Sequence, residues 1–245
     1  MVVAARPALS SDEIVSTIAD AVARERRIDA CVLYGSVARR THRQGSDIDL
    51  LVVSSDRDAA NRLLSHLWIL DAEVASRCSA STETMAGLER RRRREPAFMA
   101  HLAYEGVSVT PLSGDVLRAL RRRDFTLDEI LGEIERRHRR VAPTIDPARL
   151  NGSFVPALSR IYSCAKAVAM ARLVAVGTPD FDWASTFISV GRAQPGLATS
   201  ARNLARLRPF YLRMRGHEVA LPRVGPADLA GAASDLAVLA GAPSR

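Results

Sequence analysis

The chain has 245 residues, 47% of them hydrophobic and 25% charged, which is ordinary for a folded globular protein. It has no run of 18 apolar residues and no signal-peptide pattern at its start, so we expect a cytoplasmic protein without a transmembrane helix or a membrane partner. Three widely spaced cysteines argue against a disulfide framework or a cysteine metal site, and the net charge of +8 favours a polyanionic partner.

The first half of the chain alternates short helices with short apolar strands, as hydrophobic periodicity and turn residues indicate. The expected elements are, in chain order, a helix over 10–27, a strand over 29–34, a helical turn over 37–40, a strand over 47–53, a helix over 58–69, a strand over 71–78, helices over 83–94 and 98–104, and an edge strand over 107–110.

The second half is expected to be helical. Helices are predicted over 114–140, 154–176, 183–190, 197–208, 210–214 and 227–239, with a proline-bracketed linker over 141–147. We therefore predict a two-domain α+β/α fold. An α/β domain with a small mixed sheet spans 1–113, a charged helical connector spans 114–147, and a C-terminal helical bundle spans 148–245.

Two aspartates at the start of the second expected strand are the first candidate site residues. Alternate residues of a strand point to the same face, so Asp47 and Asp49 present two carboxylates together, while Ile48 and Leu50 point into the core. Two hard oxygen ligands at this spacing suit Mg²⁺ and the triphosphate that it accompanies. Without a cation, two carboxylates this close repel each other.

The dipeptide Gly35-Ser36 ends the first expected strand and supplies a second candidate feature. A glycine there lets the backbone approach a phosphate closely, and a helical turn that starts after Ser36 would direct its N–H groups at that phosphate. The hydroxyls of Ser36 and Ser46 add donors, and Arg39 can neutralise charge on departing pyrophosphate. Taken alone, each of these features also fits an ordinary turn or strand edge.

Together these residues resemble the DNA polymerase β-like nucleotidyltransferase superfamily, and most closely its minimal bacterial members. Their motif, GS-x-A-R followed by S-D-I-D-L, is matched at residues 35, 36, 38, 39 and 46–50. The resemblance implies Mg²⁺-dependent transfer of a nucleoside monophosphate from an NTP such as ATP to an acceptor hydroxyl, with two Mg²⁺ ions at the site.

The resemblance also implies a third carboxylate on a later strand, acting as a metal ligand or general base for the acceptor hydroxyl. Glu73 is our candidate, with Asp71 as the alternative, because both fall on one face of the expected strand over 71–78. Lys166, the only lysine of the chain, is a candidate nucleotide contact by the same resemblance. The alternative for Lys166 is a surface residue whose stem packs on the helix.

The C-terminal half is similar to helical domains related to HEPN domains and to the C-terminal domain of kanamycin nucleotidyltransferase. Residues 183–217 contain no acidic residue and six arginines, with Phe210 and Tyr211 among them. Such a stretch can hold nucleic-acid phosphates while an aromatic ring stacks on a base, although a solvated helix face explains it equally well. Of the five arginines at 90–94, we expect most to face solvent and one or two to line the path of the acceptor.

Three functions follow as hypotheses. The first is nucleotidyl transfer to RNA such as tRNA, as a toxin or regulator. The second is transfer of AMP to a partner protein, in an antitoxin-like role, or a binding module that keeps the fold. The third is modification of an aminoglycoside, which the acid-free 183–217 stretch disfavours because a polycation needs acidic walls. The sequence leaves the oligomeric state open, a homodimer included.

Overall fold

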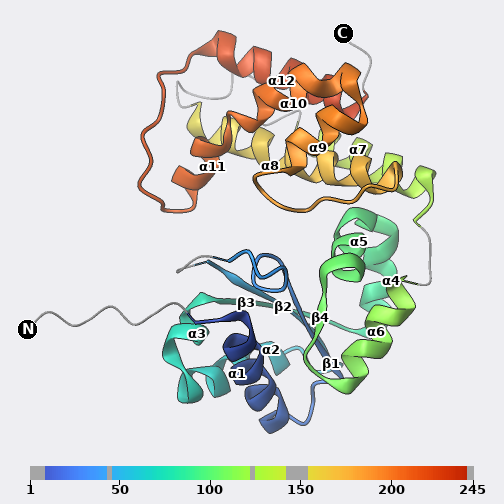
Figure 1. Cartoon of the computed structure of the whole chain (residues 1–245), viewed down its shortest axis with the longest axis vertical. Coiled ribbons are helices and arrows are strands. Elements are labelled where there is room, and N and C mark those ends of the chain that lie inside the picture. Colours follow the sequence, from blue (N-terminus) through green and yellow to red (C-terminus); the bar gives the residue numbers. More distant parts are fainter. Residues whose placement is uncertain (1–8, 43–45, 122–124, 142–153, 242–245) are drawn as a thin grey trace, which may run out of the picture. The chain divides into compact units, whose positions relative to one another are not determined.

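The computed structural model describes residues 9–42, 46–121, 125–141 and 154–241, which form two compact units. Unit 1 comprises residues up to 93 together with 98–124, and unit 2 comprises 94–97 together with 125–245. Unit 1 contains a mixed four-stranded sheet with helices, and unit 2 is helical (Figure 1). This arrangement confirms the predicted fold class.

Unit 1 is built around a sheet with the strand order β3-β2-β1-β4. Its elements are α1 (Ser11–Arg24), β1 (Ala30–Tyr34), β2 (Ile48–Val53), α2 (Ala59–Leu70), α3 (Ala72–Arg77), β3 (Cys78–Glu83), α4 (Met85–Arg94), α5 (Pro96–Glu105), β4 (Val107–Ser108) and α6 (Pro111–Arg121). β1 pairs antiparallel with both β2 and β4, and β2 pairs parallel with β3. The first two strands lie where the sequence predicts them.

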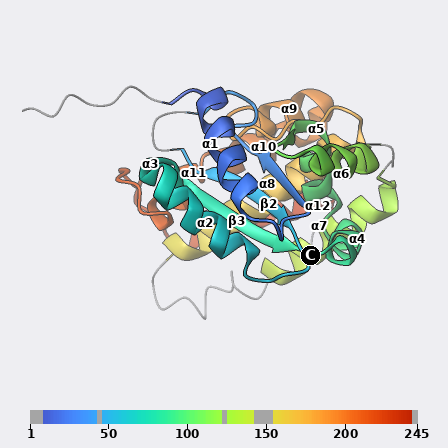
Figure 2. The same ribbon diagram turned by 90° about the horizontal axis from the view of Figure 1, so that it is seen from below.

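Helix α1 begins as its sequence requires. The side chain of Ser10 accepts a hydrogen bond from the backbone N–H of Glu13, and the carboxylate of Glu13 accepts one from the N–H of Ser10. The helix then buries Ile14 and Ile18 against the sheet. Figure 2 views unit 1 from the side on which α1 and α2 cover the strands. Their apolar side chains meet Leu33, Leu50 and the other inward residues of β1 and β2.

The predicted strand over 71–78 is wrong. Residues 72–77 form the short helix α3, and the strand begins only at Cys78. Asp71 is the cause, because its carboxylate accepts hydrogen bonds from the backbone N–H groups of Glu73 and Val74 at 2.9 and 3.1 Å and so caps the helix. Glu73 therefore lies in the first turn of a helix rather than on the sheet.

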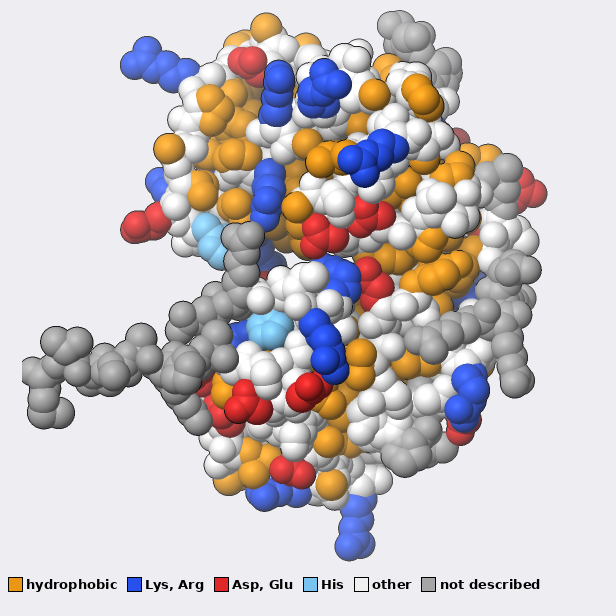
Figure 3. All heavy atoms as spheres, viewed as in Figure 1, with side chains coloured by type: hydrophobic (Ala, Val, Ile, Leu, Met, Phe, Trp, Pro, Cys, Tyr) orange, Lys and Arg blue, Asp and Glu red, His pale blue; other side chains and the backbone are white. Residues whose placement is uncertain are grey.

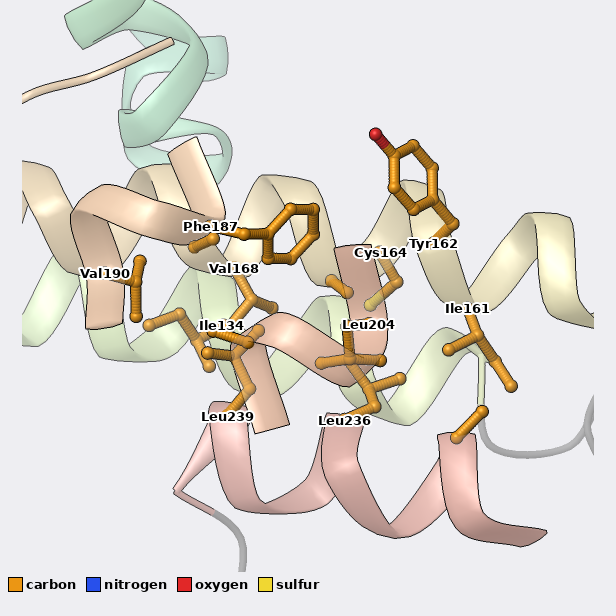
Figure 4. Close-up of a cluster of buried hydrophobic side chains, with 14 of the residues drawn as sticks. Ile134, Ile161, Tyr162, Cys164, Val168, Phe187, Val190, Leu204, Leu236 and Leu239 are labelled. Atoms are coloured by element: carbon orange, nitrogen blue, oxygen red, sulfur yellow. The ribbon is translucent and has the colours of Figure 1, made fainter. Parts of the chain in front are cut away.

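Unit 2 contains α7 (Leu127–Val141), α8 (Val155–Ala175), α9 (Thr186–Ala193), the 3₁₀ turn η3 (Pro195–Leu197), α10 (Ala198–Ala205), α11 (Arg208–Met214) and α12 (Pro226–Ala240). The 21-residue α8 is central, with α7, α9, α11 and α12 packed around it. Figure 4 shows Ile134, Val168, Leu204 and Leu239 from four of these helices pointing toward one another. Residues 142–147 of the expected linker lie outside the described residues.

The helical half differs from the prediction in detail. Residues 114–140, which the sequence predicts to be helical, contribute to two helices, α6 and α7, on either side of residues that are not described. α6 belongs to unit 1 and α7 to unit 2. Within the described parts of the chain, no helix combines the length and apolar character that crossing a membrane requires.

Candidate active site

The strongest contact at the predicted site joins the end of β1 to the start of β2. Gly35 follows β1 with φ +79°, and a Cβ atom placed on it would lie 2.6 Å from the Oδ2 atom of Asp49. The carboxylate of Asp49 therefore lies directly against the backbone of Gly35. Both the positive φ and this close approach favour glycine. The structure thus brings together two halves of the sequence motif that are 14 residues apart.

Asp49 lies on β2 as strand alternation predicts. Ile48 and Leu50, on either side of it in the chain, are fully buried against the helices that cover one face of the sheet. Asp49 is half-buried on the opposite face, and Asp47, just before the strand, is exposed. The Asp49 carboxylate is thus offered from the face of β2 opposite those helices, and Asp47 lies two residues earlier, open to solvent.

The segment after Gly35 is a single turn rather than a helix. It is closed by backbone hydrogen bonds from Arg39 N to the carbonyl of Gly35 (3.1 Å) and from Thr41 N to the carbonyl of Ser36 (2.9 Å). Ser36 is half-buried in this turn and follows the glycine that Asp49 contacts. Gly35 and Ser36 thus lie directly after the end of β1.

The Arg39 side chain is held by an acidic partner. Its Nη1 atom lies 2.6 Å from the Oε2 atom of Glu105 at the end of α5, and both side chains are largely buried. The Nε2 atom of His101, one helical turn earlier, lies 2.7 Å from the same oxygen. A phosphate that binds Arg39 has to compete with this carboxylate. The pyrophosphate contact of Arg39 stays a prediction.

Arg77 connects the loop before β2 with helix α3. Its Nε donates a hydrogen bond to the backbone carbonyl of Ser46 at 2.9 Å, and its Nη1 lies 3.8 Å from the carboxylate of Glu73. The guanidinium is nine-tenths buried, whereas the Glu73 side chain is about one-third exposed. Arg77 thus fixes the residue that precedes Asp47. Sequence reasoning missed it, because the misplaced third strand hid its position.

Strand β3 supplies hydroxyls next to the two aspartates. In the parallel register, Ser79 pairs with Asp49 and Ser81 pairs with Leu51, so both serines belong to the face that carries Asp49. Among the described residues, no cluster of three or more His, Cys, Asp or Glu side chains could hold a metal ion. The structure therefore does not gather Glu73 with Asp47 and Asp49, and its role as third carboxylate stays a prediction.

The donor set nevertheless fits one Mg²⁺ ion. Asp47 and Asp49 offer hard carboxylate oxygens at the start of β2, and Gly35 leaves room for the carboxylate of Asp49. Mg²⁺ is usually held in proteins by one or two carboxylates together with substrate phosphates and water. Asp49 on β2 and Asp47 just before it meet this requirement without a third protein ligand.

Tyr34 adds an aromatic wall that the sequence did not indicate. It pairs with Asp49 across the sheet, and its ring packs edge-on against Phe98 and His101 of α5, with centroid distances of 5.5 and 5.6 Å. Burial raises the pKa of Tyr34 to about 12, and the nearby charge of Asp49 raises it as well. The phenol thus stays protonated beside the carboxylates at neutral pH.

Lys166, the remaining predicted site residue, belongs to unit 2. It is buried on α8, with its Nζ atom 3.2 Å from the centre of the Trp183 ring. Trp183 in turn stacks on Tyr211 at 4.8 Å and on Tyr162 at 5.7 Å. The ammonium group therefore lies within an aromatic cluster, and the reading of Lys166 as a surface residue is wrong.

Comparison with known families agrees with this geometry. Residues 16–81 match the family described as Polymerase beta, Nucleotidyltransferase, a stretch that includes β1, β2, the turn between them and the first residues of β3. No curated protein matches the chain. The chain thus carries a polymerase β nucleotidyltransferase domain, which makes it an enzyme that transfers nucleoside monophosphates.

Proposed function

We propose that this enzyme transfers a nucleoside monophosphate from a Mg²⁺-bound NTP to a hydroxyl group of an RNA acceptor such as tRNA. The observation that carries the chemistry is the contact of the Asp49 carboxylate with the backbone of Gly35, with Asp47 two residues before Asp49. This contact supports an anionic metal ligand beside a glycine turn that a phosphate can approach closely.

Each residue of the motif has a separate task in this proposal. Asp47 and Asp49 hold Mg²⁺. When bound, the ion offsets the negative charge of the phosphates and makes the phosphorus atom more open to attack. The Gly35-Ser36 turn seats the triphosphate, and Ser46 adds a hydroxyl. The protein thus contributes mainly orientation and electrostatic stabilisation, which suits phosphoryl chemistry.

Two further residues of unit 1 complete the proposed site. Arg39 contacts the leaving pyrophosphate. Glu73 acts on the acceptor hydroxyl, either as general base or as a ligand of a second Mg²⁺ ion. Its link through Arg77 to the residue before Asp47 supports this role, because it connects helix α3 to the carboxylate loop.

The charge of unit 2 supports RNA as the acceptor. All six arginines in the acid-free 183–217 stretch are exposed, so they are available to phosphates in solution. Figure 3 shows basic side chains spread over the visible surface of unit 2 rather than gathered in one patch. Such a distribution suits an extended polyanion better than a compact one. A toxin or regulator that marks RNA with a nucleotide would need a surface of this kind.

The structure corrects one part of this argument. Phe210 is buried in the core of unit 2, so it cannot stack on a base as the sequence suggested. Tyr211 is partly exposed but packs on Trp183. The RNA proposal therefore depends on the arginines, and affinity should depend strongly on salt concentration.

The deciding experiment combines the protein with Mg²⁺, each α-³²P-labelled NTP in turn, and total bacterial RNA. Wild-type protein should label an RNA band, and the Asp47→Ala/Asp49→Ala double variant should lose about 10²-fold or more of that transfer. Asp20→Asn is the matched control, because Asp20 is an exposed carboxylate on α1. RNA that stays unlabelled, or equal labelling by the double variant, would refute the proposal. In parallel reactions with added protein or kanamycin, label on either one would instead support the alternative acceptors.

A further inference from the structure

The five consecutive arginines at the end of α4 differ in their surroundings. Arg90, Arg93 and Arg94 are exposed, Arg92 is buried, and the side chain of Arg91 is about one-quarter exposed. A helix turns about 100° per residue, so neighbours in a run cannot share one environment. Arg91 lies over the ring of Phe98, which packs against Tyr34 beside Asp49.

A short series of contacts connects Arg91 with Asp49. The guanidinium carbon of Arg91 lies 4.0 Å from the centre of the Phe98 ring. Phe98 packs edge-on against Tyr34, and Tyr34 pairs directly with Asp49 across the sheet. All four residues belong to unit 1. The positive charge of Arg91 lowers the pKa of Tyr34, while Asp49 raises it, so both charges act on the same phenol.

The contact of Arg91 with Glu83 is one that an oxyanion of a ligand can replace. A guanidinium stacked on an aromatic ring directs its N–H groups outward in its own plane, where planar or tetrahedral oxyanions accept them. The contact from Nη1 of Arg91 to Oε1 of Glu83 is 3.4 Å long, beyond the 2.7–2.9 Å or so of a strong charge-assisted bond. Both side chains are more than one-quarter exposed, so a ligand can reach them.

We propose that Arg91 is a phosphate-binding residue on the face of the sheet that carries Asp49. Stacking on Phe98 holds the guanidinium in place, and a substrate phosphate replaces the long contact with Glu83. That phosphate comes either from the NTP or from the backbone of the RNA acceptor. This inference rests on the proposed function for the identity of the two substrates, but binding measurements test it without any transfer reaction.

The test compares three full-length variants with the wild type. Arg91→Met keeps an apolar stem on Phe98 and removes the charge. Arg90→Met is the matched control, because Arg90 is an exposed neighbour on the same helix. Glu83→Gln removes the charge that competes for Arg91. Each protein is titrated with a non-hydrolysable NTP analogue in Mg²⁺, and separately with tRNA at several salt concentrations, while circular dichroism monitors folding.

If Arg91 binds a phosphate of the NTP, Arg91→Met weakens binding of the analogue about 10- to 100-fold, the usual range for a charge-assisted hydrogen bond. If it binds RNA, analogue affinity is unchanged and the salt slope of tRNA binding falls by about one. In either case Glu83→Gln preserves or strengthens the affected binding, and Arg90→Met leaves analogue binding unchanged.

Two results would overturn the inference. In the first, Arg91→Met leaves both analogue affinity and the tRNA salt slope unchanged. In the second, Glu83→Gln weakens binding as much as Arg91→Met does, which would identify the pair as a structural ion pair. Failure to label RNA would refute the proposed acceptor without altering the outcome of the NTP titration, so the two proposals fail separately.

Discussion

Replacing Gly35 with alanine tests the central contact of the site. Alanine at φ +79° costs about 1–2 kcal/mol of folding free energy, because its Cβ clashes with the backbone in the left-handed region. The new Cβ would also lie 2.6 Å from Oδ2 of Asp49, closer than the 3.0 Å that real Cβ atoms keep from other atoms. The carboxylate of Asp49 must therefore move.

The expected loss of activity follows from that movement. A displacement of about 1 Å in a catalytic group can cost about 10²-fold in rate. We therefore expect Gly35→Ala to lower the rate of label transfer about 10²-fold and to weaken Mg²⁺-dependent binding of an NTP analogue. Urea unfolding gives the stability loss of about 1–2 kcal/mol, and the transfer assay gives the rate.

Gly177→Ala separates the two effects. Gly177 has nearly the same backbone conformation, with φ +73°, but no atom lies within 4 Å of the position of its Cβ. It should lose stability to a similar extent and keep full activity. If Gly35→Ala is equally unstable but as active as Gly177→Ala, the contact between Gly35 and Asp49 does not position the catalytic carboxylate, and the reasoning fails.

Three further predictions concern other charged groups of unit 1. Arg77→Met should weaken Mg²⁺-dependent NTP binding about 10-fold, because the carbonyl of Ser46 loses its hydrogen bond. Arg77→Lys should not restore that affinity. Unchanged NTP binding by Arg77→Met in calorimetry would contradict the prediction. Glu73→Gln should slow transfer without loss of stability. Asp71→Asn should cost about 1 kcal/mol of stability through the lost helix cap and leave transfer intact. Slow transfer by Asp71→Asn and normal transfer by Glu73→Gln would make Asp71 the third carboxylate. Asp56 has a lowered pKa, chiefly because Arg27 donates a hydrogen bond to it. The difference in unfolding free energy between wild type and Asp56→Asn should therefore be present at pH 7 and shrink as pH falls below about 4. Unfolding curves in acid that show an unchanged difference would refute this.

The strands that carry the motif could be predicted because their signals are local. Residues 30–34 and 48–53 are apolar, short and separated by a glycine turn and a polar loop, so β1 and β2 follow from neighbouring residues alone. β3 could not be predicted in this way. Its sequence, CSASTE, has little apolar character, and it becomes a strand because it pairs with β2 about 30 residues earlier.

The difference between local signals and long-range contacts also explains which site residues could be predicted from the sequence. Asp47, Asp49 and Gly35 form a compact motif, and the structure brings Gly35 and Asp49 into contact. Arg77 reaches Ser46 from 31 positions further along the chain, and no local pattern indicates that bond. The aromatic surroundings of Lys166 likewise depend on the packing of α8 against later segments of unit 2.

Three arginines of unit 1 near the site are each paired with a glutamate, and this pairing affects how the enzyme binds a triphosphate. Arg39, Arg77 and Arg91 each have a glutamate partner, at 2.6, 3.8 and 3.4 Å. Each pair is neutral overall, so a triphosphate gains their positive charge only by displacing a carboxylate. A divalent cation held by two aspartates adds positive charge without such an exchange. The affinity for NTP should consequently fall steeply when Mg²⁺ is removed, since the protein's own cations are already engaged.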